Sequence, residues 1–540
     1  MDGHQSPLPI NEPVYAYGPG SPERAALQTP LQDQHAVCRD IPLVIGGRAL
    51  HTECRVPVVS PHEHRHVLAR LSQADGTQVR QALEAARSAA PDWASQPLEA
   101  RAAVFLKAAD LLAGPWRQRL NAATMLGQGK TVQQAEIDSA CELIDFLRWN
   151  VAFARQLASH QPVSAPGVRN AMEYRPLEGV VYAVTPFNFT AIGGNLATAP
   201  ALMGNTVIWK PAATASLSNY LFMQLLEEAG LPPGVINFVP GDPALVSDTV
   251  LDSEDFAGLH FTGSTAVFDS LWQQVAKRLP RYRSYPRLVG ETGGKDFVLA
   301  HASADVDALA TGLLRGAYEY QGQKCSAASR AYVPRSIWPG LRARLADLID
   351  TVRMGDVRDF GNFMSAVIDA RAHARIADAI ARARNDSGVE IVAGGQADDS
   401  VGYFIRPTLI EVQDPRHALM TTELFGPVLT VYVYDDAKWT DTLTLVDTTS
   451  AYGLTGAVFA RDRNAIAQAQ RALRQAAGNF YINDKPTGAV VGQQPFGGAR
   501  RSGTNDKAGS AWNLLRWTSP RTIKETYVAP TQYAYPHMAR

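Results

Sequence analysis

Hydrophobic residues first recur at helical spacing over residues 77–158. The first apolar face consists of Val79, Leu83, Ala86 and Ala90, and the last of Ile137, Cys141, Ile144 and Leu147. Between them, Pro97 stands where the first turn of a second helix accepts a proline. The spacing therefore predicts a helical layer, in which Cys141 is a small buried apolar side chain without chemistry.

From residue 179 the pattern changes to short apolar runs that alternate with helical segments. The first series of runs covers residues 180–184, 207–209, 235–239 and 259–261, and the second covers 297–300, 331–333, 428–434 and 457–459. Helical patterns separate the runs, for example over 304–317 and 369–383. Strand and helix in alternation predict two doubly wound parallel sheets, and hence an α/β fold. Ligands of such sheets bind at the carboxyl ends of the strands, in a cleft.

Three segments do not follow this alternation. Residues 1–40 are rich in proline and glycine and predict an irregular arm on the surface, while residues 162–178 have the alternation of an exposed hairpin. The aromatic-rich residues 511–540 predict an irregular tail that packs on a neighbour. We therefore expect one α/β domain from 41–161 and 179–292, a second from 293–510, and an arm from 162–178 and 511–540.

Composition excludes several classes of function. The 540 residues carry 51 basic and 52 acidic side chains, a net charge of −1, which gives no electrostatic field for nucleic acid or an anionic membrane. No apolar run approaches the roughly 20 residues of a membrane helix, so we expect a soluble protein. The four cysteines form no close pair, which argues against a metal knuckle or a disulfide framework and favours a reducing compartment.

Polar residues between the predicted strands and helices are the candidates for chemistry. Cys325 lies in a polar, glycine-containing stretch where Lys324 can favour the thiolate, so it is either a nucleophile or an incidental surface thiol. Glu291, between glycines, is either a general base on flexible backbone or a solvated loop residue. Asn188 follows a buried strand and is either an oxyanion donor or a turn former.

A second group of candidates suits a dinucleotide. Lys210 directly follows an apolar strand and can bind ribose or phosphate, although a solvated strand end explains it equally well. Gly263 and Ser264 lie between a strand and a helix and offer backbone N–H groups to a pyrophosphate. The G-x-G-x-x-G fingerprint is missing, so these residues alone indicate at most a variant dinucleotide site.

Taken in order, seven motifs make the chain resemble the aldehyde dehydrogenase superfamily from about residue 40 to about residue 525. They are Thr-Pro-Phe-Asn (185–188), Trp-Lys-Pro (209–211), Phe-Thr-Gly-Ser (261–264), Gly-Glu-Thr-Gly-Gly (290–294), Gly-Gln-Lys-Cys (322–325), Glu-Leu-Phe-Gly-Pro (423–427) and Pro-Phe-Gly-Gly (495–498). Residues 187–195, 322–327, 480–485, 491–500 and 502–507 most resemble the branch that oxidises L-glutamate γ-semialdehyde.

The resemblance implies two Rossmann-type domains, the first binding NAD and the second catalytic, with a β-hairpin and C-terminal arm for oligomerisation. It implies NAD-dependent oxidation of L-glutamate γ-semialdehyde, which is in equilibrium with Δ1-pyrroline-5-carboxylate, to L-glutamate in the second step of proline degradation. Cys325 would form a thiohemiacetal, Asn188 would hold its oxyanion, and Glu291 would activate water against the thioester. The implied cofactor contacts are Thr185, Lys210, Gly263, Ser264, Thr265, Ala266, Val267 and Glu423. The implied substrate contacts are Lys324, Ser326, Gly488, Ala489 and Phe496.

One residue departs from the family pattern. Three positions after Lys210, many NAD-specific relatives have a glutamate that repels a 2′-phosphate, whereas this chain has Ala213, which leaves room for NADP. A different aldehyde dehydrogenase, for example one for succinate semialdehyde, and a catalytically silent relative are the alternatives. The resemblance further implies a homodimer or higher homo-oligomer, in the cytoplasm of a bacterium or the mitochondrial matrix of a eukaryote.

Overall fold

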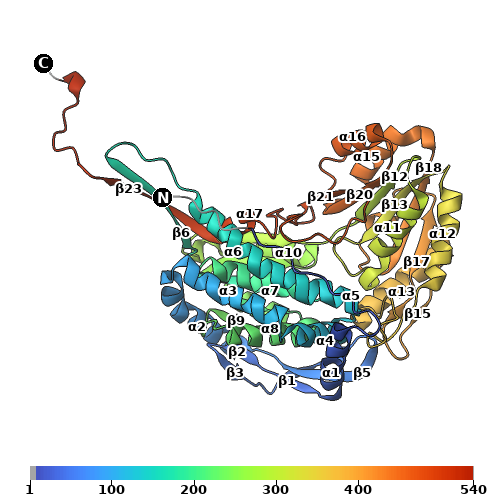
Figure 1. Ribbon diagram of the computed structural model, residues 1–540, viewed down its shortest axis with the longest axis horizontal. Coiled ribbons are helices and arrows are strands. Elements are labelled where there is room, and N and C mark those ends of the chain that lie inside the picture. Colours follow the sequence, from blue (N-terminus) through green and yellow to red (C-terminus); the bar gives the residue numbers. More distant parts are fainter. Residues whose placement is uncertain (1–7, 539–540) are drawn as a thin grey trace.

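The computed structural model describes residues 8–538 and has an α/β fold with two seven-stranded sheets, each covered by helices (Figure 1). The first sheet has the order β11 (Arg287–Glu291), β10 (Phe256–Thr262), β7 (Val180–Val184), β8 (Thr206–Lys210), β9 (Ile236–Phe238), β2 (Leu43–Ile45) and β3 (Arg48–Leu50). The second has the order β14 (Val389–Ala393), β17 (Thr408–Val412), β18 (Val428–Tyr434), β13 (Ala328–Pro334), β12 (Asp296–Ala300), β20 (Thr455–Phe459) and β21 (Asn479–Ile482). Apart from β2, β3 and β14, neighbouring strands are parallel, which confirms the predicted fold class.

Both sheets are buried on both faces, which explains why their strands read as continuous apolar runs. In β7, Val181 and Ala183 belong to one core cluster, and Val180 and Tyr182 belong to another. One face packs on α3 (Leu98–Ala113), α7 (Thr190–Leu202) and α8 (Ser216–Glu228), and the other on α2 (Gly76–Ser95), α9 (Pro243–Leu251) and α10 (Thr265–Arg278). The second sheet lies between α11 (Val306–Tyr318) with α12 (Trp338–Thr351) on one face and α13 (Ala370–Arg384), α15 (Trp439–Thr449) and α16 (Arg463–Ala472) on the other.

The helical layer predicted over residues 77–158 is present, with one irregular turn. After α4 (Arg117–Gln128) and α5 (Val132–Ala135), residues Glu136–Glu142 form a π-helical turn that leads into α6 (Leu143–Ser159). A π turn is wider than an α turn, so it changes which side chains share a face. Cys141 is buried as expected, but Ile137 is 36% exposed, so the prediction that these two residues share one apolar face is wrong.

The N-terminal arm is partly helical. Residues 22–36, within the segment expected to be irregular, form α1 (Pro22–Ala36), which is capped by Ser21 and buries Leu27 and Leu31. The preceding residues 8–20 run along the surface without regular structure, as expected, and residues 1–7 of the predicted arm lie outside the described residues. A third sheet of β1 (Arg39–Ile41), β5 (Glu63–Ser72) and β4 (Arg55–Ser60) follows, which the sequence pattern did not predict.

The expected hairpin over residues 162–178 is instead a single strand. β6 (Val168–Pro176) pairs antiparallel along its whole length with β23 (Thr518–Thr526), and the two-stranded ribbon projects from the body of the protein (Figure 1). The tail after residue 511 is therefore not wholly irregular. Local alternation predicted the extended backbone of β6 but carried no information about a partner strand more than 340 residues away.

The remaining strands and helices are short. They are α14 (Ala418–Thr421), α17 (Ala511–Leu515), β15 (Ala397–Asp398), β16 (Phe404–Ile405), β19 (Tyr452–Gly453) and β22 (Ala499–Arg500), with 3-10 turns at Ala213–Ala215, Leu279–Arg281, Glu319–Gly322, Asp436–Lys438 and Pro536–Met538. Among residues 8–538, no helix combines the length and apolar character needed to cross a bilayer.

Candidate active site

Strands β11, β10, β7 and β8 are neighbours in the first sheet, and polar residues follow their carboxyl ends. Glu291 ends β11, Gly263 follows β10, Thr185 follows β7 and Lys210 ends β8. Because these strands are parallel, the four residues lie along one sheet edge, where doubly wound folds bind ligands. The sheet order thus brings together residues that are far apart in the sequence.

Lys210 is buried at this edge without a counter-ion in contact. Its side chain is 8% exposed, and burial lowers the pKa of the ammonium to about 8. Among residues 8–538, no group accepts a hydrogen bond from its Nζ. Thr185, by contrast, accepts a hydrogen bond from Trp209 Nε1 at 3.1 Å. A buried donor without an acceptor is the arrangement expected for a site that binds hydroxyl or phosphate oxygens.

The first turn of α10 lies beside Lys210 on the same edge. Ser264 caps this helix, and its Oγ accepts a hydrogen bond from Val267 N at 3.4 Å. Thr265 Oγ1 donates to the Arg501 carbonyl at 3.3 Å, and Ala266 is exposed. The unpaired N–H groups of a helix start favour an anion, so this turn fits a pyrophosphate.

Two glycines after β11, Gly293 and Gly294, allow the segments that contain Glu423 and Cys325 to approach the backbone closely. A Cβ on Gly293 would lie 2.2 Å from Glu423 Oε2, and one on Gly294 would lie 2.2 Å from the Cys325 carbonyl oxygen. Gly294 N also donates to Glu423 Oε1 at 2.9 Å. Burial raises the pKa of the Glu423 carboxyl to about 7. The Gly-Gly pair of the 290–294 motif is therefore required for this close approach.

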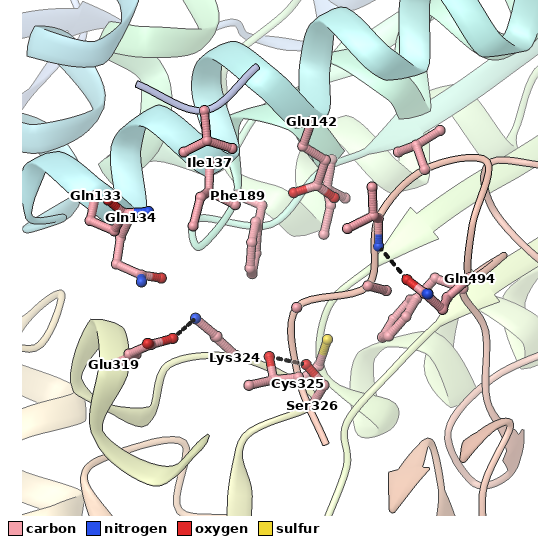
Figure 2. Close-up of a pocket in the computed structure, with 18 of the residues that line it drawn as sticks. Gln133, Gln134, Ile137, Glu142, Phe189, Glu319, Lys324, Cys325, Ser326 and Gln494 are labelled. Carbon is pink, nitrogen blue, oxygen red and sulfur yellow. Dashed lines mark hydrogen bonds and ion pairs between the residues drawn. The ribbon is translucent and has the colours of Figure 1, made fainter. Parts of the chain in front are cut away.

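A cavity of about 720 Å³ lies next to this junction (Figure 2). Of the residues proposed from the sequence, it is lined by Glu291, Lys324, Cys325, Ser326, Gly488, Ala489 and Phe496. Its opposite wall is helical and carries Gln133, Gln134, Ile137 and Glu142 (Figure 2). The structure thus gathers Cys325, Glu291 and every predicted substrate contact around one space. The predicted cofactor contacts lie along the edge of the first sheet and in the first turn of α10, except Glu423, which comes from the second domain.

Cys325 is partly exposed and lines the cavity. Burial raises the pKa of its thiol well above the usual value, and the nearby carboxylates of Glu291, Asp296 and Glu423 raise it further. The expectation that the environment of Cys325 favours the thiolate is therefore wrong. Lys324, which was expected to favour it, instead forms an ion pair with Glu319, with Nζ 3.2 Å from Oε2.

The backbone before Cys325 is left-handed over three consecutive residues. Tyr320, Gln321 and Gly322 have φ values of 52°, 56° and 66°. Such conformations are unfavourable for non-glycine residues and persist only where their surroundings hold them. Gln321 does this through Nε2, which donates to the carbonyls of Gly129 at 2.9 Å and Ala366 at 2.7 Å. We call residues 320–325 the nucleophile loop.

Glu291 stands on rigid backbone, not on the flexible backbone that its glycine neighbours suggested. Gly290 N donates to Thr504 Oγ1 at 2.9 Å, and Thr292 N donates to the Ser502 carbonyl at 3.1 Å. A Cβ on Gly290 would lie 2.3 Å from Phe268, so this glycine serves packing. Burial raises the pKa of the Glu291 carboxyl to about 8, although the Lys507 ammonium opposes this shift.

Asn188 joins the loop after β7 to the nucleophile loop. It is 3% exposed and does not line the cavity, and its Nδ2 donates to the Gln323 carbonyl at 3.0 Å. A side-chain amide has two N–H donors, so one remains after this bond. Asn188 is thus one hydrogen bond away from the backbone two residues before Cys325, and its role as an oxyanion donor stays a prediction.

The predicted substrate contacts lie on a polar turn. Ser326 Oγ donates to Thr487 Oγ1 at 2.8 Å, so Thr487 orients this hydroxyl, a role that no motif indicated. Gly488 has a φ of 94°, a conformation that favours glycine, and Val490 N donates to Gln494 Oε1 at 2.9 Å. These contacts fix the backbone of the turn that contains Ala489.

Glu142 is the main residue that sequence reasoning missed. It ends the π turn and points into the cavity from the wall opposite Cys325 (Figure 2). Burial raises the pKa of its carboxyl to about 8. Helical periodicity gave no signal for it, because Glu136, Asp138 and Glu142 stand among other polar residues that an ordinary α-helix would place on a solvated face.

No metal was expected, and one group of potential ligands lies away from the cavity. Within the described residues, His35, Glu63 and His66 place ligand atoms within 4.8 Å of one another. The rings of His35 and His66 stack with centroids 3.9 Å apart at 6°. The lone pair of a ring nitrogen lies in its ring plane, and two parallel planes share no position for one ion. The group therefore carries no metal site in this arrangement.

Comparison with known proteins identifies the family. The family model described as "Aldehyde dehydrogenase family" matches residues 49–523. The chain is 54% identical to the mouse mitochondrial delta-1-pyrroline-5-carboxylate dehydrogenase, over 99% of this chain and 96% of the relative, and 53% identical to the human enzyme, over 99% and 95%.

Solved structures match equally well. The delta-pyrroline-5-carboxylate dehydrogenase from Mycobacterium tuberculosis, bound with NAD, has a TM-score of 0.96 at 58% identity and covers 100% of both chains. The Thermus 1-pyrroline-5-carboxylate dehydrogenase with bound NAD has a TM-score of 0.91 at 32% identity, covering 96% of this chain and 100% of the other. From its sequence, its fold and the arrangement around Cys325, this chain belongs to the aldehyde dehydrogenase family.

Proposed function

We propose that this protein oxidises L-glutamate γ-semialdehyde, which is in equilibrium with Δ1-pyrroline-5-carboxylate, to L-glutamate with NAD, the second step of proline degradation. One observation carries the proposal: a single cavity is lined by Cys325 and Glu291, and Glu142 points into it from the wall opposite Cys325. This arrangement suits a substrate with an aldehyde at one end and an ammonium at the other. The names of the relatives support the same activity.

The reaction begins at Cys325. Because the pKa of its thiol is raised, the thiol would pass its proton to a water molecule in the cavity as the sulfur attacks the aldehyde carbon. A C–S bond forms, the C=O double bond opens, and a thiohemiacetal oxyanion results. The second N–H of Asn188 Nδ2 and the backbone N–H of Cys325 would hold this oxyanion. Loss of one such donor costs about 10²–10³ in rate. Asn188 and Cys325 therefore act as one unit.

The sheet edge fits a dinucleotide. Lys210, whose ammonium is buried without an acceptor, would bind a ribose hydroxyl or a phosphate, and Gly263 with the first turn of α10 would bind the pyrophosphate. Glu423, fixed by Gly294 N, would hold the nicotinamide ribose. Bound NAD would supply the hydride acceptor that turns the thiohemiacetal into a thioester.

Glu291 completes the reaction by hydrolysis. In its carboxylate form it would accept a proton from water while the water oxygen attacks the thioester carbon. The C–S bond then breaks, the acid is released, and the Cys325 thiolate takes up the proton held by Glu291. A pKa of about 8 makes Glu291 a stronger base than an ordinary carboxylate while leaving part of it ionised at neutral pH. An enzyme that passes its acyl group to a thiol would not need this base.

The opposite wall would recognise the amino acid end of the substrate. The carboxyl of Glu142 would receive the ammonium, and the backbone N–H groups of the turn at Gly488 and Ala489 would receive the carboxylate. Phe189 and Phe496 also line the cavity and would cover the aliphatic chain. A volume of about 720 Å³ lies within the range of small-molecule sites.

A steady-state comparison tests the proposal. Pyrroline-5-carboxylate, succinate semialdehyde and propanal are each offered with NAD and with NADP, and formation of reduced cofactor is followed. We expect the highest kcat/KM with pyrroline-5-carboxylate and NAD, because the other two aldehydes lack the ammonium that Glu142 would bind. A higher kcat/KM for succinate semialdehyde would favour the alternative aldehyde dehydrogenase. No turnover of any aldehyde would favour the silent relative.

We also propose that the ribbon of β6 and β23 is an oligomerisation arm. The ribbon projects from the body of the protein (Figure 1). Its residue Ile523 is 38% exposed, and Tyr527, directly after β23, is 61% exposed. Light scattering should give a mass of at least two chains, and Ile523→Asp should lower it. A monomeric wild type would contradict this proposal. We further propose that the protein is located in the cytoplasm if its source is a bacterium and in the mitochondrial matrix if its source is a eukaryote.

A further inference from the structure

Lys130 is a fully buried lysine that contacts both loops that carry the chemistry. Its side chain is 1% exposed, and its Nζ donates to Asp138 Oδ2 at 2.7 Å. The same Nζ lies 3.9 Å from the centre of the Phe189 ring and 4.5 Å from the centre of the Tyr320 ring. Phe189 directly follows Asn188, and Tyr320 begins the nucleophile loop. One ammonium group therefore joins the two segments through cation–π contacts.

Asp138 fixes the first of these segments from the other side. Its Oδ2 accepts the backbone N–H of Thr190 at 2.9 Å, and its Oδ1 accepts that of Ala191 at 2.8 Å. These are the first N–H groups of α7, which have no partner within the helix. A carboxylate at a helix start satisfies them and is favoured by the helix dipole. The start of α7, and with it the position of Asn188, depends on Asp138.

The nucleophile loop is held from the same place. Besides the contact of Lys130 with Tyr320, the carbonyl of the preceding residue, Gly129, accepts the hydrogen bond from Gln321 Nε2. Tyr320 and Gln321 are the two non-glycine residues with left-handed backbone in this loop. Strained residues stay in place only when several contacts determine them. Residues 129 and 130 provide two of these contacts.

We propose that Lys130 and Asp138 are a positioning pair, which fixes the Asn188 amide relative to Cys325 without touching substrate or cofactor. This inference rests on the proposed chemistry at Cys325 and not on the identity of the aldehyde. A buried ion pair contributes little net stability compared with apolar residues of the same size, so its effect here lies in geometry. The Asn188 amide donates directly across the two segments to the Gln323 carbonyl, and this bond depends on both flanks being aligned.

Lys130→Met and Asp138→Asn test the pair, with Arg155→Met as the matched control. Arg155 and Glu99 also form an ion pair between two helices, but this pair is exposed and remote from both loops. Misplacement of a catalytic group by about 1 Å can cost on the order of 10²-fold in rate. We expect kcat to fall by up to about 10²-fold in both variants, with the KM for NAD within about twofold of wild type. Lys130→Arg should recover part of kcat, and Arg155→Met should change neither constant.

Amide hydrogen exchange gives a readout that is independent of turnover. Peptides covering residues 185–191 and 319–326 should exchange faster in Lys130→Met than in wild type, whereas the control should match wild type. If Lys130→Met does not fold, Tyr320→Leu keeps the ion pair and removes one ring contact, and a several-fold loss of kcat is expected. Folded variants with unchanged exchange and kcat within twofold would overturn the proposal.

A second aldehyde separates this inference from the proposed substrate. Alignment of Asn188 and Cys325 affects every aldehyde, so the ratio of variant to wild-type kcat should be similar for pyrroline-5-carboxylate and propanal. If the wild-type protein oxidises propanal but not pyrroline-5-carboxylate, the proposed substrate is rejected. The positioning pair is then still tested by the kcat of the variants with propanal and by their hydrogen exchange. A loss confined to one aldehyde would overturn the positioning role, because it would indicate a contact with that substrate.

Discussion

The two walls of the cavity present carboxyls with the same pKa in different settings. Glu291 and Glu142 both have a pKa raised to about 8 by burial. Glu291 ends a strand and is surrounded by glycines and by backbone hydrogen bonds, with the Lys507 ammonium nearby. Glu142 ends a π turn, and its neighbours are charged side chains, including those of Asp138 and Lys130.

The walls are therefore built by different means. Backbone conformation shapes the strand wall, where three left-handed residues and the Gly293–Gly294 pair set the distances around Cys325. Buried charges hold the π turn that carries the helical wall. Glu136, in this turn, is 0% exposed and accepts hydrogen bonds from Tyr17 Oη at 2.8 Å and Asn121 Nδ2 at 2.8 Å. We expect substitutions on the strand wall to remove chemistry and those on the helical wall to weaken binding and alter stability.

The largest contrast is expected between two cysteines: Cys325, which lines the cavity, and Cys141, which lies in the π turn that carries Ile137 and Glu142 of the helical wall. Cys325→Ala removes the only group that can form the covalent intermediate, so turnover should fall below detection. Cys141→Ala removes a thiol in the π turn whose raised pKa keeps it neutral, so kcat should stay within about twofold of wild type. Initial rates of reduced cofactor formation measure both. Full activity in Cys325→Ala would end the proposed mechanism.

Glu291→Gln should separate the two halves of the reaction. The amide keeps the shape of the side chain but cannot accept a proton, so kcat should fall by about 10²–10⁴. Formation of the thioester should survive, which predicts one rapid equivalent of reduced cofactor per site and an acyl adduct on Cys325 by mass spectrometry. Glu142→Gln should show no such burst. Absence of the adduct together with a large loss of kcat would move Glu291 out of the hydrolysis step.

The strand wall could be predicted from the sequence, and the helical wall could not. Apolar runs and the polar residues after them gave the two sheets, the positions of Cys325 and Glu291, and the sheet edge with Lys210, because strand ends in parallel sheets are local features. The aldehyde dehydrogenase motifs then connected these residues. The protonated state of Cys325 was not predictable, because its raised pKa comes from Asp296 and Glu423 as well as from burial.

Long-range strand pairing and local helix irregularity limited the prediction of the remaining elements. The partner of β6 lies at the other end of the chain, so the pattern predicted a hairpin where there is a ribbon with β23. Helical periodicity does not reveal the π turn. The sequence pattern therefore predicted Ile137 on a buried face, where the structure has it 36% exposed, and did not identify Glu142 as a cavity residue. The domain boundaries stay a prediction. The roles of the contact residues also stay predictions, which the variants described here test.

On the helical wall, Glu142→Gln should weaken binding while leaving chemistry intact. Losing a charge-assisted hydrogen bond to the ammonium costs about 1.5–3 kcal/mol, so the KM for pyrroline-5-carboxylate should rise roughly 10- to 100-fold. The KM for propanal, which has no ammonium, should not change. Steady-state kinetics of Glu142→Gln and wild type with both aldehydes measure these KM values. An equal rise for propanal would mean that the substitution distorts the cavity.

The same variant should be more stable than wild type at high pH. The folded-state pKa of Glu142 is raised from 4.5 to about 8, so ionising this buried carboxyl costs stability as the pH rises from about 4.5 to about 8. At pH 7 the cost is up to about 3 kcal/mol. Thermal unfolding at pH 5 and pH 8 should therefore show a gain in Tm for Glu142→Gln that is larger at pH 8. A gain independent of pH would reject this cause.

The pH dependence of kcat should report the strand wall. Hydrolysis requires the Glu291 carboxylate, and its pKa of about 8 means that kcat falls about tenfold per pH unit below pH 8 and levels off above it. The residual kcat of Glu291→Gln should not show this fall below pH 8, whereas the kcat of Glu142→Gln should still show it. Turnover rates at saturating substrate between pH 6 and pH 9 measure the profile. A limb retained in Glu291→Gln would assign the titration to another group.

The smallest effect is expected where the strand wall meets the solvent. Ala213 is exposed at the start of a 3-10 turn, three residues after Lys210. In Ala213→Glu, a carboxylate there would repel the 2′-phosphate of NADP and accept a hydrogen bond from the ribose hydroxyl of NAD. We expect kcat/KM for NADP to fall roughly tenfold and that for NAD to stay within about twofold, with the difference shrinking at high salt. Ala213→Gln, which has the same shape without the charge, is the control. An equal loss of NADP use in that control would assign the effect to side-chain size, and an unchanged NADP rate in Ala213→Glu would mean that the ribose does not reach this turn.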